Sequence, residues 1–342
     1  MPLPHKDKVV MGHGSGGTMT RALIADIFQR HFSNAILDQE NDFAALPLEK
    51  GMRVVVSTDG HIVSPIFFPG GDIGRLAVSG TVNDVAMSGG QVKYLTASFI
   101  LEEGFSLADL ERVAQSMQTA AAEAGVTIVA GDTKVAENGK ADGIFISTSG
   151  VGFVHADLHI GGAQAKPGDA VIVSGSMGDH GIAVLAARNQ LGFTTTIQSD
   201  VAPLNGLIRA ALQAAPSIHV LRDPTRGGLA TTLNEIARQS QVDIHLEETA
   251  IPVKREVRAA CEMLGFDPLY VANEGKVIVI LPQEQAQAAL DALHAHPLGR
   301  DAVWIGQVEA QAWNTPRVSM GTLIGGTRIV DMLSGEMLPR IC

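Results

Sequence analysis

The last residue of the chain, Cys342, is a thiol with several possible chemical uses. The chain holds two cysteines, and the other, Cys261, lies in an apolar stretch with helical spacing. A terminal thiol can carry a group as a nucleophile, bind a metal, or be incidental, and attack requires the thiolate form. Arg340 would favour that thiolate, whereas the terminal carboxylate would disfavour it. The segment 331–342 could span roughly 40 Å when extended, so the thiol could visit its own protein's site and a partner's.

Four short acidic motifs in the first half of the chain could bind a hard cation. They are Glu40-Asn-Asp42, Ser57-Thr-Asp59, Asn83-Asp84 and Gly131-Asp-Thr133. We expect each carboxylate to lie in or beside a loop, near the end of a strand or helix. If these loops converge, Asp42, Asp59, Asp84 and Asp132 form a cage suited to Mg²⁺. The alternative is that each aspartate only caps a helix or a turn.

Two further residues could act on a substrate beside such a cage. Lys134 follows Asp132 in a predicted strand-end loop, where its charge could face a phosphate or an anionic intermediate. The alternative is a surface lysine paired with Asp132. Glu274, in Asn273-Glu-Gly-Lys276, precedes a predicted strand and could act as a general base. The alternative there is a simple turn.

The glycine-rich motif His13-Gly-Ser-Gly-Gly17 resembles a phosphate-binding loop in composition, although a flexible linker would look the same. Neither a Walker A motif nor a dinucleotide-binding fingerprint is present. The eleven histidines show no spacing typical of a transition-metal site.

Composition narrows the class of protein. A net charge of −11 has the wrong sign for a nucleic-acid-binding protein. Two cysteines cannot build a disulfide framework, which favours a reducing compartment. No apolar run is long enough for a transmembrane helix, and the first residues lack a signal peptide. We therefore expect a cytoplasmic protein without membrane or nucleic-acid partners.

The elements that must position these residues alternate between strands and helices. Buried strands are expected at 54–57, 94–101, 126–130 and 144–153, from apolar runs bounded by turn residues. Helices are expected at 18–32, 73–88 and 106–124. For the last, Ser106 is a predicted N-cap and Gly125 a predicted C-terminal cap.

The second half repeats the order of strand, Gly- and Asp-containing loop, then helix. Strands are expected at 171–174 and 277–281, and helices are expected up to Arg188, up to Gln239 and after Pro282. We divide the chain into a segment 1–40, a first domain 41–160, a second domain 161–330 and a tail 331–342. The fold class predicted is α/β (α+β) with two domains.

Taken together, these motifs resemble the HypE family of hydrogenase maturation carbamoyl dehydratases. This family is part of the superfamily of aminoimidazole ribonucleotide synthetase, selenophosphate synthetase and thiamine-monophosphate kinase. The resemblance runs nearly end to end, and the ending Pro339-Arg-Ile-Cys342 is its most specific element. The other matching motifs are His13-Gly-Ser-Gly-Gly17, Ser57-Thr-Asp59, Phe67-Phe-Pro-Gly-Gly71, Asn83-Asp-Val-Ala86, Gly131-Asp-Thr-Lys134, Gly178-Asp-His-Gly181, Arg222-Asp-Pro-Thr-Arg-Gly-Gly228 and Asn273-Glu-Gly-Lys276.

The resemblance implies an architecture and a reaction. The first domain would pair its sheet with a twin in a barrel-like homodimer, and ATP with Mg²⁺ would bind between the two domains. A carbamoyltransferase, HypF, would load a carbamoyl group onto Cys342. ATP-dependent dehydration would turn the S-carboxamide into a thiocyanate. The cyano group would pass to iron held by HypC and HypD, as a cyanide ligand of [NiFe]-hydrogenase.

The resemblance also implies roles for individual residues. Cys342 would carry the substrate, Glu274 would be a base, and Lys134 would stabilise charge near the thiocarboxamide. Asp42, Asp59, Asp84 and Asp132 match the acidic metal and phosphate positions. The remaining nucleotide-binding positions implied are Asn83, Gly131, Thr133 and Asp223.

Two other functions remain open from the sequence. The same fold could serve a selenophosphate-synthetase-like or small-molecule kinase activity, although this chain has no cysteine before Cys261. A non-enzymatic metal carrier using Cys342 is the other, and a single thiol is a thin ligand set.

Overall fold

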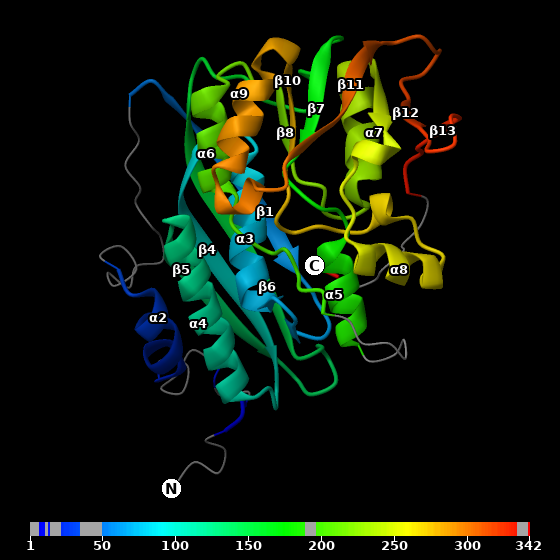
Figure 1. Ribbon diagram of the computed structural model, residues 1–342. Coiled ribbons are helices and arrows are strands. Elements are labelled where there is room, and N and C mark those ends of the chain that lie inside the picture. Colours follow the sequence, from blue (N-terminus) through cyan, green and yellow to red (C-terminus); the bar gives the residue numbers. More distant parts are fainter. Residues whose placement is uncertain (1–6, 11–12, 14–21, 35–49, 189–195, 334–340) are drawn as a thin grey trace, which may run out of the picture.

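A computed structural model describes residues 7–10, 13, 22–34, 50–188, 196–333 and 341–342. Two sheets with their helices are stacked one above the other, and the C-terminus lies between them (Figure 1). Short helical segments at Ile24–Gln29 and Arg30–Phe32 precede the first sheet. The part of the predicted helix 18–32 that precedes residue 22 lies outside the described residues.

The first sheet has four strands in the order β1-β6-β4-β5. Two helices, α3 (Ile73–Ala86) and α4 (Leu107–Ala124), cover one of its faces (Figure 1). Strands β4 and β5 are parallel and joined through α4, and the other pairs are antiparallel. The strands are β1 (Met52–His61), β4 (Gln91–Glu102), β5 (Thr127–Ala136) and β6 (Ile144–His155).

The ends of α4 follow the sequence signals. The Ser106 hydroxyl accepts a hydrogen bond from the Asp109 backbone N–H, and Gly125 ends the helix with φ of +66°. A side chain at that φ would be strained, so glycine suits the position. Helix α3 begins at Asp72, whose carboxylate accepts from the backbone N–H groups of Gly74 and Arg75.

Strands β1 and β5 are longer than predicted, and this corrects the setting of two acidic residues. Asp59 lies inside β1 and Asp132 inside β5, because the ladders with β6 and β4 continue through both positions. Asp84 lies in the last turns of α3, within the predicted helix 73–88. Lys134 is likewise within β5, not in a strand-end loop.

The face of the first sheet opposite α3 carries exposed apolar side chains. Val54 and Val56 of β1 are 51% and 68% exposed, and Ile100 of β4 is also exposed. Within the described residues no helix covers this face (Figure 1).

The second sheet has seven strands in the order β13-β12-β9-β11-β7-β10-β8. Its strands are β7 (Asp169–Val173), β8 (Val220–Arg222), β9 (Val242–Glu247), β10 (Ile278–Pro282), β11 (Val303–Ala310), β12 (Val318–Gly321) and β13 (Thr327–Ile329). The helices of this half are α5 (Asp179–Ala187), α6 (Asn205–Ala214), α7 (Gly228–Ser240), α8 (Arg255–Leu264) and α9 (Gln283–His294).

Strand β7 shows how the second sheet joins the first domain. All five of its residues are buried, because helices cover both faces. Ala170 and Ile172 pack into a core that contains α6, α9 and the apolar side chains of the first domain. Val171 and Val173 pack into a separate core with α7. The two halves of the chain therefore share one continuous apolar core.

A short hairpin, β2 (Phe67–Phe68) with β3 (Gly71–Asp72), lies between β1 and α3. Within the described parts of the chain, no helix has the length and apolar character needed to cross a membrane.

Candidate active site

The end of the chain is docked between the two domains. The carbonyl of Cys342 accepts a hydrogen bond from the backbone N–H of Ile62, at 3.0 Å. The carbonyl of Ile341 lies 2.7 Å from Nε2 of His180, at the start of α5. The Ile341 side chain is only 4% exposed and belongs to the shared core. The thiol is therefore held inside the interface rather than projecting into solvent.

The surroundings of Cys342 keep its sulfur protonated. Burial, and then the Glu274 carboxyl, raise the pKa of Cys342 to about 12, although Arg226 opposes them. Arg226 hydrogen-bonds to the Cys342 side chain, and the charge that Cys342 carries once it ionises raises the pKa of the guanidinium. At neutral pH the docked sulfur is a thiol, which is a poor nucleophile.

Four carboxyl groups from both domains lie within electrostatic reach of one another beside this thiol. They are Asp59 and Asp84 of the first domain and Asp223 and Glu274 of the second. Burial, followed by the charges of Asp223 and Asp200, raises the pKa of Glu274 well above its usual range. Oε1 of Glu274 is buried with no hydrogen-bond partner among the described residues.

The pKa values of Asp223 and Asp84, two other members of the cluster, are raised as well. Burial and the charge of Asp84 raise the pKa of Asp223 to about 7. Burial also raises the pKa of Asp84, whose Oδ2 accepts a hydrogen bond from the Ser57 hydroxyl at 2.9 Å. Because neighbouring carboxylates repel one another, such a cluster favours the binding of a cation between them.

A glycine allows the first-domain side chains to lie over α3. A Cβ at Gly80 would sit 3.1 Å from Cε1 of His61 and 3.5 Å from Oδ2 of Asp59. Nε2 of His61 lies 3.2 Å from the Thr148 hydroxyl and 3.8 Å from Asp59. A larger residue at position 80 would therefore push on both polar groups.

The loop that carries Glu274 is fixed from several sides. Its backbone N–H donates to Asp200, at 3.0 Å, and Asp200 is also paired with Lys276 at 3.0 Å. The neighbouring Asn273 is fully buried, donating to the Pro224 carbonyl and accepting from the backbone N–H of Gly178. The motif, for which a simple turn was the alternative, is thus a rigid support that aims Glu274 at the interface.

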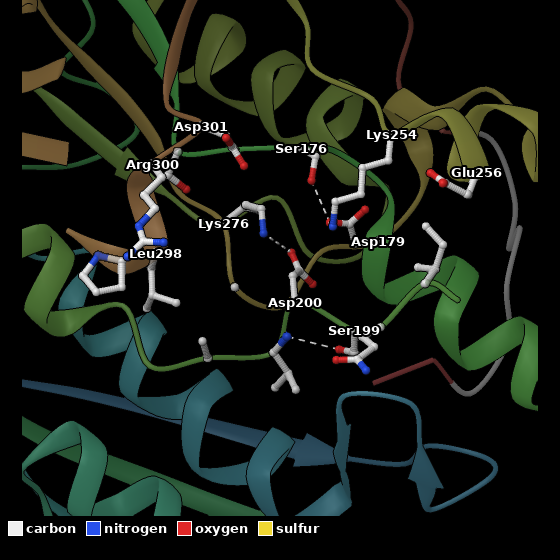
Figure 2. Close-up of a pocket in the computed structure, with 18 of the residues that line it drawn as sticks. Ser176, Asp179, Ser199, Asp200, Lys254, Glu256, Lys276, Leu298, Arg300 and Asp301 are labelled. Atoms are coloured by element: carbon white, nitrogen blue, oxygen red, sulfur yellow. Dashed lines mark hydrogen bonds and ion pairs between the residues drawn. The ribbon is translucent and has the colours of Figure 1, made fainter. Parts of the chain in front are cut away.

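A cavity of about 700 Å³ lies beside this loop. Figure 2 shows residues that line it. Two of its lysines are paired with aspartates: Lys276 with Asp200 at 3.0 Å, and Lys254 with Asp179 at 2.7 Å (Figure 2). Neither Cys342 nor Glu274 lines this cavity. Asp200 already binds Lys276 and the backbone N–H of Glu274. We therefore assign Asp200 to the support of Glu274 rather than to a separate binding site.

The acidic cluster fits Mg²⁺ only in part. In the described part of the chain, no three His, Cys, Asp or Glu residues form a complete metal site. Asp42 lies outside the described residues. Asp59, Asp84 and Asp223 offer oxygen ligands of the kind that Mg²⁺ prefers, and phosphate oxygens usually supply others.

Asp132 does not join this cluster within one chain. Across the sheet, Asp59 of β1 is aligned with Thr148 of β6 and Ala97 of β4. Asp132 of β5 is aligned with Ser98, the residue after Ala97 on β4. Neighbouring residues on a strand point to opposite faces, so Asp132 points away from α3. Its carboxylate is exposed and pairs with Lys134 at 2.8 Å, which is the surface pair considered as the alternative. The predicted metal role of Asp132 and charge-stabilising role of Lys134 stay predictions.

The other predicted nucleotide-binding residues are placed as follows. The buried amide of Asn83 donates to the carbonyls of Ala202 and Glu274 and accepts from the Leu204 backbone N–H. It therefore ties α3 to the second domain. Thr133 is buried within β5, and a Cβ at Gly131 would lie 3.0 Å from the Ala97 carbonyl. Their contacts with a nucleotide stay predictions.

Two residues near the thiol were not found from the sequence. Arg226 belongs to the Arg222–Gly228 motif, in which only Asp223 was singled out as a site residue. His180 belongs to the Gly178–Gly181 motif, which carried no assigned role. Only the fold brings these motifs to the end of the chain. Arg340, the cation expected beside Cys342, lies outside the described residues.

We predict that Asp223→Asn stabilises the protein at pH 7 in the absence of ATP and Mg²⁺. A carboxyl with a folded-state pKa of about 7, against 3.8 normally, holds its proton in the folded state. The protonated Asp223 carboxyl contributes to the free energy of unfolding. This contribution is fully present below pH about 4 and is lost as pH rises to about 7. Urea midpoints across that range should fall in the wild type and fall less in the variant. The exposed Asp157→Asn should keep the wild-type profile.

Comparison with known proteins agrees with the two-domain fold. Residues 40–154 match the family model of the AIR synthase related protein N-terminal domain, and residues 166–318 match that of its C-terminal domain. Carbamoyl dehydratase HypE of Azotobacter vinelandii is 58% identical over 334 residues, covering 98% of this chain and 97% of that protein.

The chain belongs to the HypE family.

Solved structures of the HypE family support the same assignment. A crystal structure of hydrogenase maturation protein HypE in complex with ATP has a TM-score of 0.93 and 52% identity, covering 97% of this chain and 99% of that one. A chain of a HypE–HypF complex has a TM-score of 0.79 and 48% identity, covering 91% and 100%. The predicted family and the predicted two-domain fold are confirmed.

Proposed function

We propose that this protein is an ATP-dependent carbamoyl dehydratase that acts on its own C-terminal cysteine. The observation that carries this proposal is the docking of Cys342 beside Glu274 and Arg226, against a cluster of carboxyls from both domains. The names of its HypE-family relatives, and the ATP complex of one of them, support the same reaction class.

The chemistry starts from an S-carboxamide on Cys342. Its amide oxygen is a poor leaving group, and transfer of the γ-phosphoryl group of ATP to that oxygen makes it a good one. Loss of both N–H protons, with departure of the oxygen in phosphate, leaves a thiocyanate. The products are ADP, phosphate and the S-cyano group, so the water formally removed appears in the phosphate.

The residues around Cys342 have distinct tasks in this scheme. The Glu274 carboxyl, with its unpartnered buried oxygen and raised pKa, would accept a proton from the amide nitrogen. Arg226 would hold the group on sulfur by a hydrogen bond and offset the negative cluster. Asp59, Asp84 and Asp223 would hold Mg²⁺, which neutralises phosphate charge when bound.

Loading of the carbamoyl group requires another position of the tail. In the docked position the pKa of about 12 leaves almost no thiolate at neutral pH. A free cysteine has a pKa near ~8.5, so an undocked tail presents far more of the reactive form. We propose HypF as the loading enzyme, supported by the HypE–HypF complex of a relative, and a HypC–HypD complex as the acceptor. The setting would be the cytoplasm.

The test is the mass of the C-terminal peptide. Purified protein is incubated with HypF and its carbamoyl donor, with Mg²⁺ and with or without ATP for the second step. We expect Cys342 to gain the mass of one carboxamide and then, only with ATP, to lose the mass of one water. A carboxamide that persists through ATP hydrolysis would exclude the dehydratase.

We also propose a homodimer through the exposed face of the first sheet. The uncovered apolar side chains of β1 and β4 suit a sheet-to-sheet contact. Asp132 and Lys134 lie on the same face, so their predicted roles would be exercised near the twin chain.

Val56→Asp is expected to shift the protein from dimer to monomer in sedimentation equilibrium. Val56 is 68% exposed at this face, and two charges brought together there would be desolvated. Met263→Asp, at an exposed position on α8, should leave the mass unchanged. A wild-type monomer at micromolar concentration contradicts the dimer.

A further inference from the structure

The last two residues of the chain are held by one hydrogen bond from each domain. The backbone N–H of Ile62, just after β1, donates to the Cys342 carbonyl. Nε2 of His180, in the first turn of α5, meets the Ile341 carbonyl at 2.7 Å. Two successive residues of the tail are therefore hydrogen-bonded from opposite sides of the interface.

The hydrogen bonds around His180 determine which of its ring nitrogens carries a proton. A carbonyl can only accept, so Nε2 must be the donor to Ile341. The ring is fully buried, and burial lowers the pKa of His180, so the neutral form is favoured. Nδ1 is then an acceptor, and the Ser199 hydroxyl, 2.8 Å away, must donate to it.

Ser199 is itself held in place for this task. Its hydroxyl oxygen accepts from the Val201 backbone N–H at 3.1 Å, and its own N–H donates to the Pro69 carbonyl at 2.8 Å. The hydroxyl proton is therefore free to point at Nδ1. The Phe68 ring packs edge-to-face against the imidazole from another side. The ring centroids are 5.5 Å apart and the planes meet at 88°. The contacts with Ser199 and Phe68 come from outside the tail, and they hold the ring of His180 in the orientation that presents Nε2–H to the Ile341 carbonyl.

A fixed donor at this point sets the register of the tail. One residue of extended chain spans roughly 3.5 Å, so a slip of one position would move the sulfur away from Arg226 and Glu274. Backbone recognition at Ile341 and Cys342, together with burial of the Ile341 side chain, leaves one register.

We propose that His180 is a positioning residue, whose Nε2–H holds the Ile341 carbonyl and so delivers Cys342 to the acidic cluster in one register. Ser199 supports it by fixing the tautomer. The proposal deepens the proposed function, but docking can be measured without ATP or turnover, so failure of one is distinguishable from failure of the other.

The experiment measures alkylation of each cysteine by N-ethylmaleimide at fixed pH, read by mass spectrometry of the two peptides. Cys342 reports on docking of the tail. Cys261 is buried in the second domain, so it reacts when the domain unfolds and serves as an internal control. The variants are His180→Asn, His180→Gln and Ser199→Ala in the full-length chain.

The two amide variants separate hydrogen bonding from packing. The amide nitrogen of glutamine reaches the position of Nε2, whereas that of asparagine reaches only that of Nδ1. We expect His180→Asn to speed Cys342 alkylation about tenfold, equivalent to about 1.4 kcal/mol. His180→Gln should stay near the wild-type rate. Ser199→Ala should give an intermediate increase, because it removes the donor to Nδ1.

Three results would overturn the proposal. One is an unchanged Cys342 rate in His180→Asn, and another is an equal increase in both amide variants. The third is a wild-type Cys342 that already reacts as fast as in denatured protein. If Cys261 also becomes reactive in the His180 variants, Ser199→Ala decides, because it keeps the ring: an unchanged Cys342 rate there contradicts the role.

Discussion

Glu274→Gln is expected to slow the ATP-driven loss of water from the loaded tail by about 10²- to 10⁴-fold. Glutamine keeps the shape and the backbone contacts of the loop but cannot accept a proton from the amide. The intact mass of the C-terminal peptide, followed over a single turnover, measures the step. Loading of the carboxamide should proceed as in the wild type, because the undocked tail reacts away from Glu274.

The pH profile adds a second signature to this variant. Because burial raises the pKa of Glu274, the base form appears only as pH rises through that raised pKa. The wild-type dehydration rate should therefore increase as pH rises through the pKa of Glu274. The Glu274→Gln variant should not show this increase. Stability has the opposite sign, since a raised carboxyl pKa stabilises the folded state at low pH and this is lost as pH rises.

Glu284→Gln is the matched control, because Glu284 is exposed on α9. It should dehydrate at the wild-type rate. Equal rates for Glu274→Gln and the wild type would assign the proton transfer to another group.

Cys342→Ser should abolish both mass changes on the tail. A hydroxyl has a far higher pKa than a thiol and offers almost no anion at neutral pH, so it does not take up the carbamoyl group. Cys261→Ser provides the matched control, since Cys261 is buried among apolar side chains of a separate core. It should retain loading and dehydration, with at most a loss of stability. A serine tail that is carbamoylated at the wild-type rate would refute a thiol carrier.

Much of the fold was predictable from local signals in the sequence. Ser106 and Gly125 bound α4 where expected, and the helices predicted to start near Ile73, to end at Gln239 and to follow Pro282 are confirmed. These elements are long and amphipathic or have clear caps, so local physics decides them. The short strands β12 and β13 have no such signals, and tertiary contacts form them.

The predicted acidic cage shows where sequence reasoning stops. Whether an aspartate points to one face of a sheet or the other depends on a single residue of register. The end of β5 was predicted at Ala130, and the strand continues through Asp132, which turns that carboxylate to the face away from Asp59. Asp223 and Glu274 complete the cluster from the second domain instead. Only the packing of two domains on a shared core reveals that.

The docked chain end has a kinetic consequence. A substrate that is part of the polypeptide has an effective concentration fixed by the tail and not by the amount of enzyme in the cell. Under the proposed function, the dehydration step would be first order in loaded protein, with a Michaelis constant for ATP but none for the amide. Dilution would slow the loading by a partner while leaving the later step unchanged, so scarcity of the protein would appear as unloaded tails rather than as stalled intermediates.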